Sequence, residues 1–237
     1  MRLLTDPVLR GRIGHLRRHG GAVERAALGR VDAVLVSHAH LDHLDVASLR
    51  VLAAPATELI VPRGVDALVG GLGFGAVRQL AVGESARVAG AVDVTATPAA
   101  HGGRRHPLGP DHPAVGYLVA GSQRVYFAGD TDLFGEMAAL AAGGLDAALL
   151  PVWGWGPRLG PGHLDPRSAA EALALLRPRL AIPIHWGTLF PIGLDRLRGH
   201  LLTDPPHRFA AAAARAAPEV EVRVLQPGGS TPLPPRA

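Results

Sequence analysis

The feature that most constrains this chain is an apolar run followed at once by a cluster of histidines. The run Val31–Val36 predicts a buried strand. The cluster Ser37-His38-Ala39-His40-Leu41-Asp42-His43 then places four metal-capable side chains within six residues. Side chains alternate along an extended chain, so His38 and His40 can point the same way, while Asp42 and His43 follow beyond a turn. The spacing predicts a loop at a strand end that binds two metal ions.

The alternative interpretation of this cluster is a polar surface turn. At this chain's own residue frequencies, about 0.002 chance matches to the pattern His-x-His-x-Asp-His are expected. Chance therefore explains the cluster poorly. Four ligands do not complete two sites, however, because a catalytic zinc takes about three protein ligands and a water.

Three further metal-capable side chains stand at the ends of other predicted strands. His101 follows the apolar segment 92–97, Asp130 follows 124–128, and His185 follows 180–184. Each of them alone is more often an ordinary polar loop residue. Together with the first cluster they supply the number of ligands that two ions need.

Composition narrows the chemistry of the site. The chain has no cysteine, which excludes disulfides, a thiolate nucleophile and Cys-ligated metal. We find no serine elbow motif, so a triad hydrolase is not expected. No segment has 18 uncharged apolar residues in a row and no signal peptide begins the chain, so we expect a cytoplasmic protein without a transmembrane span.

Positive charge is concentrated near the start of the chain. The formal net charge is +4, and residues 1–30 carry seven arginines against Asp6 and Glu24. Such a patch can attract phosphates or an anionic membrane surface, and the alternative is a solvated basic face. Because no basic stripe with interleaved aromatic residues occurs, nucleic acid is not an expected partner.

The order of the predicted elements is typical of an α/β protein. Strands are expected near residues 31–36, 58–62, 77–80, 92–97, 115–119, 124–128, 147–151, 180–185 and 221–225. Helices are expected near residues 21–28, 133–142, 166–177 and 205–217. Without a linker or a repeat, residues 1–237 are predicted to form a single domain, with residues 227–237 as a flexible Pro/Gly tail.

The ordered motifs, His-x-His-x-Asp-His, a later His, an Asp after Gly and a last His, resemble the metallo-β-lactamase-fold hydrolases. The likeness runs from about Arg2 to Gly228. It implies a four-layer αββα sandwich. Members of that group usually have one or two strands before the segment that matches Leu3–Leu9. Either the natural start lies upstream, or the sheet lacks its first N-terminal strands.

The resemblance also implies a ligand set. His38, His40 and His101 would hold one ion, Asp42, His43 and His185 the other, and Asp130 would bridge them. Zinc is the usual metal of the group, and manganese or iron also accept these ligands. Water shared by the two ions would supply the attacking hydroxide. The candidate catalytic residues are Asp42, Asp130 and His163.

Finer motifs, such as Ile184-His185-Trp186-Gly187-Thr188, are similar to the branch that contains N-acyl-phosphatidylethanolamine phospholipase D and relatives of ascorbate-6-phosphate lactonase. They imply hydrolysis of a phosphodiester or a related anionic, phospholipid-like small molecule. Lactone or thioester hydrolysis by the same metals, and an inactive binding protein, are the alternatives.

Several other residues are candidates for contacts around the site. Arg104, Arg105 and His163 are candidates for binding an anionic substrate, against the alternative of ordinary surface and loop residues. Asp32 is a candidate for orienting a ligand histidine. The three tryptophans, Trp153, Trp155 and Trp186, are candidates for lining a pocket. The sequence does not indicate an oligomeric state.

Overall fold

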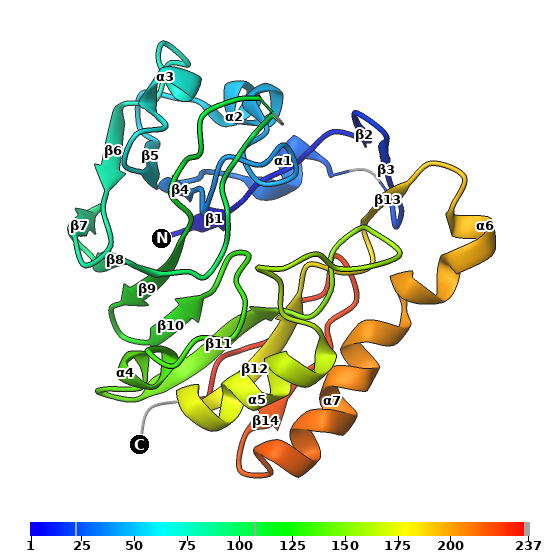
Figure 1. The fold of residues 1–237 in the computed structure, drawn as a ribbon. Helices are drawn as coiled ribbons and strands as arrows, with labels where there is room; N and C mark the ends of the chain where they lie inside the picture. The colour runs from blue at the N-terminus through cyan, green and yellow to red at the C-terminus, as the bar shows by residue number, and fades with distance from the viewer. Residues whose placement is uncertain (22, 107, 235–237) are drawn as a thin grey trace.

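The computed structural model describes residues 1–21, 23–106 and 108–234 (Figure 1). Its strands are β1 (Leu3–Thr5), β2 (Arg12–Ile13), β3 (Leu16–Arg18), β4 (Ala33–Leu35), β5 (Glu58–Pro62), β6 (Ala76–Leu80), β7 (Ser85–Val88), β8 (Val92–Pro98), β9 (Val115–Ala120), β10 (Arg124–Phe127), β11 (Leu145–Pro151), β12 (Pro178–Ile184), β13 (Leu189–Pro191) and β14 (Glu221–Val222). Its helices are α1 (Arg25–Leu28), α2 (Val46–Leu52), α3 (Asp66–Val69), α4 (Met137–Leu140), α5 (Pro166–Leu176), α6 (Asp195–Arg198), the 3₁₀ helix η1 (Gly199–Leu202) and α7 (Asp204–Ala216).

Two sheets face each other, and helices cover their outer sides (Figure 1). The smaller sheet is parallel, with strand order β1-β4-β5-β6. The larger sheet is mixed, with order β14-β12-β11-β10-β9-β8-β7. Helices α2 and α3 lie outside the smaller sheet, and α4, α5 and α7 lie outside the larger one. The predicted four-layer αββα sandwich is confirmed.

Three hydrophobic clusters fill the three spaces between these layers. In β4, Ala33 and Leu35 belong to the cluster between the two sheets, while Val34 packs with the residues of α2 and α3. Both faces of the strand are therefore buried, which explains its uninterrupted apolar run. The third cluster joins β11 and β12 to α5 and α7 through residues such as Leu173 and Phe209. Burial of each such side chain contributes about 1.5–3 kcal/mol.

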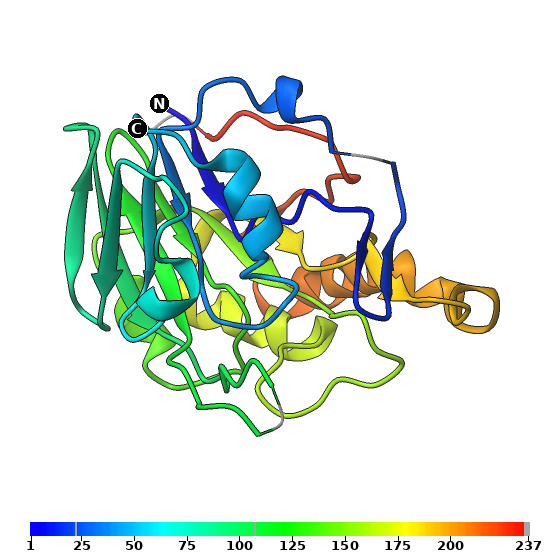
Figure 2. The same cartoon turned by 90° about the horizontal axis from the view of Figure 1, so that it is seen from above.

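A third, small sheet stands apart from the sandwich. The hairpin β2–β3 pairs with β13 in the order β13-β3-β2. Seen from above, this hairpin and α6 lie at the same end of the molecule (Figure 2). None of these short strands was predicted from the sequence, because two or three residues are too few to show a period.

The predicted strands and helices largely match the observed ones, with shorter ends. Of the helix expected near 21–28, the described residues form α1; Gly21 has φ of 97°, a value that no α-helix contains. The helix expected near 166–177 forms as α5, with the Asp165 carboxylate accepting hydrogen bonds from the backbone N–H groups of Arg167 and Ser168.

The tail predicted at 227–237 lies partly outside the described residues, which end at 234. Residues 227–234 form no helix or strand. Arg223 nevertheless donates hydrogen bonds to Thr231 Oγ1 and to the Pro232 carbonyl, and Gln123 donates one to the Pro234 carbonyl. None of the helices in the described part of the chain has the length and apolar character needed to cross a bilayer.

Candidate metal centre

Five strands deliver side chains to one edge of the sandwich. Strands β1, β4, β8, β10 and β12 end just before Asp6, His38, His101, Asp130 and His185, respectively. The strands of the smaller sheet are parallel, and in the larger sheet β8, β10 and β12 run in one direction. Their carboxyl ends therefore meet at the same edge, where ligands of α/β sheets commonly bind.

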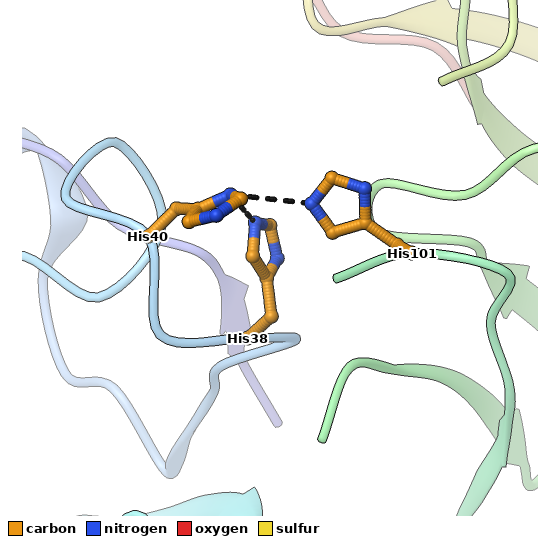
Figure 3. Close-up of side chains that lie close together, drawn as sticks. All are labelled: His38, His40 and His101. Carbon is orange, nitrogen blue, oxygen red and sulfur yellow. Dashed lines mark hydrogen bonds between the residues drawn. The ribbon is translucent and has the colours of Figure 1, made fainter. Parts of the chain in front are cut away.

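Three histidines converge on the first candidate ion position (Figure 3). The distance from His38 Nε2 to His40 Nδ1 is 2.9 Å, and that from His101 Nε2 to His40 Nδ1 is 3.2 Å. The three ring nitrogens all lie within 4.8 Å of one another. His101 Nδ1 donates to the Gly162 carbonyl at 2.7 Å, so its Nε2 is left with a lone pair that points at the other rings.

Asp42, His43 and His185 form a second group beside the first. His43 Nε2 lies 2.9 Å from His185 Nε2, and Asp42 Oδ2 lies 3.5–3.6 Å from these two nitrogens. His185 adopts φ of 61° in the left-handed region, where a residue other than glycine is strained. That backbone conformation turns the side chain back toward the histidine loop.

Asp130 lies between the two groups. Its Oδ2 is 3.2 Å from His43 Nε2, and its Oδ1 is 3.5 Å from His185 Nε2. With His101 and His163 it forms another set of groups within 4.8 Å of one another. The carboxylate is only 3% exposed, and its Oδ1 has no hydrogen-bond partner among the described residues. A buried carboxylate oxygen without a partner is costly unless a cation satisfies it.

Asp6, which the sequence analysis did not single out, supports both groups. Its Oδ1 accepts from the Ser37 backbone N–H at 2.7 Å, and its Oδ2 accepts from Ser37 Oγ at 2.6 Å and from His43 Nδ1 at 2.7 Å. Because Ser37 Oγ gives its proton to Asp6, it accepts from His38 Nδ1 at 2.9 Å. The Nε2 lone pairs of His38 and His43 therefore both face the candidate metal positions.

Asp32, by contrast, does not orient a ligand histidine, and this prediction was wrong. Its carboxylate accepts from the Arg2 backbone N–H at 2.7 Å and lies 3.1 Å from Arg30 Nε. Asp32 stands just before β4, whereas the histidine loop follows the other end of that strand. Asp6 follows β1 and therefore lies at the edge that carries the site, whereas Asp32 precedes β4 and lies at the opposite edge.

The protonation of the two groups differs. Burial lowers the pKa of His101 to about 4, and it lowers the pKa of His38 and His40 as well. Burial alone would lower the pKa of His43 too, but Asp130, Asp42 and Asp6 raise it well above its ordinary value. Burial would raise the pKa of Asp42, yet His43 and His185 lower it to about 2.

This donor set fits divalent metal. Every candidate atom is an imidazole nitrogen or a carboxylate oxygen, which are ligands that zinc accepts. The lone pairs of His38, His43 and His101 point inward, and Asp130 Oδ1, which accepts no hydrogen bond from the described residues, lies between the groups. The residues could hold two ions, with His38, His40 and His101 around one, Asp42, His43 and His185 around the other, and Asp130 within reach of both.

These protonation states predict a stepwise loss of metal on acidification. His43 has a raised pKa, so protons compete for its group at a higher pH than for the group of His101, whose pKa is about 4. Affinity then falls about tenfold per pH unit for each competing proton. If the centre holds two ions, metal content after dialysis at a fixed free zinc concentration is expected to fall in two steps as the pH is lowered, with the ion beside His43 lost at the higher pH.

A His101→Ala variant identifies which ion leaves first. This variant lacks a ligand of the first ion, so the ion that remains is the one beside His43. If that ion leaves first, its pH midpoint in the variant equals the higher of the two midpoints of the unmodified protein. Loss of both ions of the unmodified protein in one step, or retention of the variant's ion down to the lower midpoint, would contradict the assignment.

Gly129 places Asp130 by a close approach of two backbones. It has φ of 62°, and a Cβ atom at this position would lie 2.6 Å from Ser37 Cβ. Gly129→Ala is expected to lower the free energy of unfolding by about 2–4 kcal/mol, because left-handed strain and overpacking add. Urea unfolding measures this. At Gly135 a Cβ would meet no atom within 4 Å, so Gly135→Ala is the control, and equal midpoints for the two variants would refute the expectation.

A pocket of ≈ 330 Å³ opens onto the two groups. It is lined by His40, Asp42, Asp130 and His185 on one side. Its other walls come from the β2–β3 turn and from the loop after β11, including Ile13, His15, Leu16, Trp155, Arg158, Leu159 and His163. His15, in the turn between β2 and β3, makes an edge contact with Trp155 at a ring-centroid distance of 5.0 Å.

Of the three residues predicted to contact an anionic substrate, two line this pocket and one does not. His163 lines the pocket, with Nε2 at 3.6 Å from Asp130 Oδ2. Arg105 also lines it, but its guanidinium donates to the carbonyls of Ala39 and Leu44 at 2.7 and 2.9 Å, so it holds the histidine loop. Arg104 is exposed and does not line the pocket.

Of the three tryptophans, Trp155 lines this pocket and Trp186 lines a neighbouring pocket of ≈ 310 Å³. Trp153 lines neither of these two. Its indole Nε1 donates to the Gly156 carbonyl at 3.1 Å and so ties the loop after β11 to itself. The expectation of a tryptophan-lined pocket therefore applies to Trp155 and Trp186.

Comparison with known proteins supports the class of this site. Residues 1–186 match the model of the Beta-lactamase superfamily domain. A UPF0173 metal-dependent hydrolase of Opitutus terrae is 34% identical over 96% of this chain and 90% of its own length. The chain therefore belongs to the metallo-β-lactamase superfamily and to its metal-dependent hydrolases.

Other relatives differ in length and in what is known of them. An uncharacterized protein of Mycobacterium tuberculosis is 33% identical over 96% of this chain, which spans 63% of that protein's length. Among solved structures, an isothiocyanate hydrolase from Delia radicum gut bacteria has the same fold, with a TM-score of 0.71, 18% identity, and coverage of 96% of this chain and 90% of that one.

Proposed function

We propose that the protein is a dinuclear metallo-hydrolase that cleaves an ester bond of a small anionic molecule, with a phosphodiester as the first candidate. The observation that carries the proposal is the convergence of seven imidazole and carboxylate groups, among them the buried Asp130 oxygen that accepts no hydrogen bond from the described residues. His38, His40 and His101 would hold one ion, Asp42, His43 and His185 the other, and Asp130 both. Zinc suits this set, and manganese or iron would also accept it.

When bound, two divalent ions lower the pKa of a shared water and polarise the ester oxygen. The chain itself orients the reaction. Asp130 faces both groups and would fix the direction of the attacking water. His163 Nδ1 lies 3.2 Å from the carbonyls of Gly160 and Pro161, so it donates there and its Nε2 faces the site. This Nε2 can take up a proton and deliver it to the leaving group.

Lactone or thioester hydrolysis is the second candidate, and a specific observation favours it. The pocket walls formed by the β2–β3 turn and the loop after β11 carry several apolar side chains, Ile13, Leu16, Trp155 and Leu159. Such a wall suits the carbon skeleton of a lactone or an acyl group as well as the alkyl part of a phosphodiester. The narrower likeness to the phospholipase D and lactonase branch stays a prediction, as does a substrate with a lipid-like chain.

The proposal is tested with zinc-loaded protein, bis-p-nitrophenyl phosphate and a panel of lactones. We expect close to two zinc equivalents per chain and release of p-nitrophenol at a rate that chelation abolishes. Robust lactone opening without phosphodiester cleavage would reverse the order of the two candidates. Protein that binds no metal and cleaves nothing would instead be a binding protein on this fold.

A further inference from the structure

The pocket above the candidate metal centre carries two arginines, and the chain itself engages only one of them. Arg105 is committed to the carbonyls of Ala39 and Leu44. Arg158, an exposed residue, lines the same pocket, and its side chain has no hydrogen-bond or ion-pair partner in the part of the chain that the structure describes. An unpaired guanidinium with five donors at a pocket wall is suited to an incoming oxyanion.

The loop that carries Arg158 is held in place by its own residues. Trp153 Nε1 donates to the Gly156 carbonyl at 3.1 Å. A Cβ atom at Gly154 would lie 3.2 Å from Leu159 Cδ2 and 3.8 Å from His185 Cε1, so the loop passes beside both Leu159 and the candidate ligand His185. The loop follows β11, whose end lies between those of β10 and β12. Arg158 is therefore presented from the same edge as Asp130 and His185.

The surroundings of Arg158 define what would reach it. The same pocket is lined by Arg158, by the candidate ligands and by apolar side chains, including Leu16, Leu41, Trp155 and Leu159. Its carboxylates, Asp42 and Asp130, belong to the candidate ligand set, and two divalent ions would more than balance their charge. Of the two arginines of this pocket, Arg158 is therefore the one available to a charged end of the substrate.

We propose that Arg158 recognises an oxyanion, a carboxylate or a phosphate, on the part of the substrate that does not react. The substrate class is then a small ester whose apolar arm ends in a negative charge. This inference rests on the proposed hydrolase function, and it moves anion recognition from Arg104 and Arg105, where the sequence suggested it, to the loop after β11.

The test compares ligands that differ only in the second anion. Zinc-loaded protein is titrated by calorimetry with succinate, glutarate and adipate, and with the monocarboxylates of the same carbon number. 3-Phosphonopropionate beside succinate compares a phosphonate with a carboxylate. We expect at least one diacid to bind about tenfold or more tightly than its monoacid. Arg158→Gln is expected to remove that preference, and Arg104→Gln, an exposed arginine outside the pocket, to keep it.

Three outcomes overturn the inference: no diacid preference in the unmodified protein, a preference that survives Arg158→Gln, or one that Arg104→Gln removes. The zinc content of each variant is measured as well, because a fall in zinc would indicate damage to the metal centre and not lost recognition. If Arg158→Gln loses zinc, Arg158→Lys, which keeps the positive charge, is used in its place. A preference that depends on Arg158 in protein that hydrolyses no ester rejects the proposed function alone. Hydrolysis without such a preference rejects this inference alone.

Discussion

Replacement of Asp130 by asparagine is expected to lower the rate of ester hydrolysis by about 10³-fold or more. The Asp130 carboxylate lies 3.2 Å from His43 Nε2 and 3.5 Å from His185 Nε2, and its Oδ1 has no hydrogen-bond partner among the described residues. The asparagine amide has the same shape but no negative charge. It cannot balance the charge of a metal ion, and its N–H₂ group would point toward that ion. Activity and metal content measured together report the effect.

The matched control for this change is Asp93→Asn. Asp93 is an aspartate of β8 whose carboxylate forms an exposed ion pair with Arg87 at 2.7 Å. Exposed pairs contribute about 0–1 kcal/mol, so this variant is expected to keep its activity and its metal. An Asp130→Asn protein that retained two ions and more than a tenth of the original rate would show that Asp130 has neither proposed role.

The positions of the site residues could be predicted from the sequence because each follows an apolar run. A strand rich in apolar, aromatic or β-branched residues is easy to recognise, and the residues just after it lie at the sheet edge. His38, His101, Asp130 and His185 all satisfy this rule, although their roles as ligands stay proposals. Asp6 satisfies it as well, but β1 has only three residues, so the strand that precedes it was not recognised.

What the sequence could not provide was the pocket wall. The turn between β2 and β3 and the loop after β11 meet there, with His15 against Trp155, although about 140 residues separate them in the chain. Helix α2, of seven residues, was missed because it is too short to show a helical period; its Asp45 cap, which accepts from Ser48 N–H, was the available clue. Loops of this kind carry specificity without leaving a pattern.

Asp6→Asn is expected to weaken both metal positions at once, by about 10–100-fold in affinity. Oδ1 accepts from the Ser37 backbone, and Oδ2 accepts from Ser37 Oγ and His43 Nδ1. Asparagine has a single oxygen, so either orientation of its amide turns a donor toward a donor. If the N–H₂ group takes the place of Oδ2, it donates to Ser37 Oγ. Ser37 Oγ can then donate its own proton to His38 Nδ1. The proton of His38 would in that case sit on Nε2, the nitrogen that faces the metal position.

The substitution is expected to add no backbone strain. Asp6 has φ of 41°, a conformation that asparagine tolerates about as well as aspartate. Asp32→Asn is the control, since that carboxylate accepts from the Arg2 backbone at the other end of β4. A competitive zinc titration of each variant separates the two binding steps. If Asp6 couples the groups, both steps weaken in Asp6→Asn and neither changes in Asp32→Asn. Weakening of only the step assigned to His43 would mean that the Ser37–His38 branch of the network does not control its histidine.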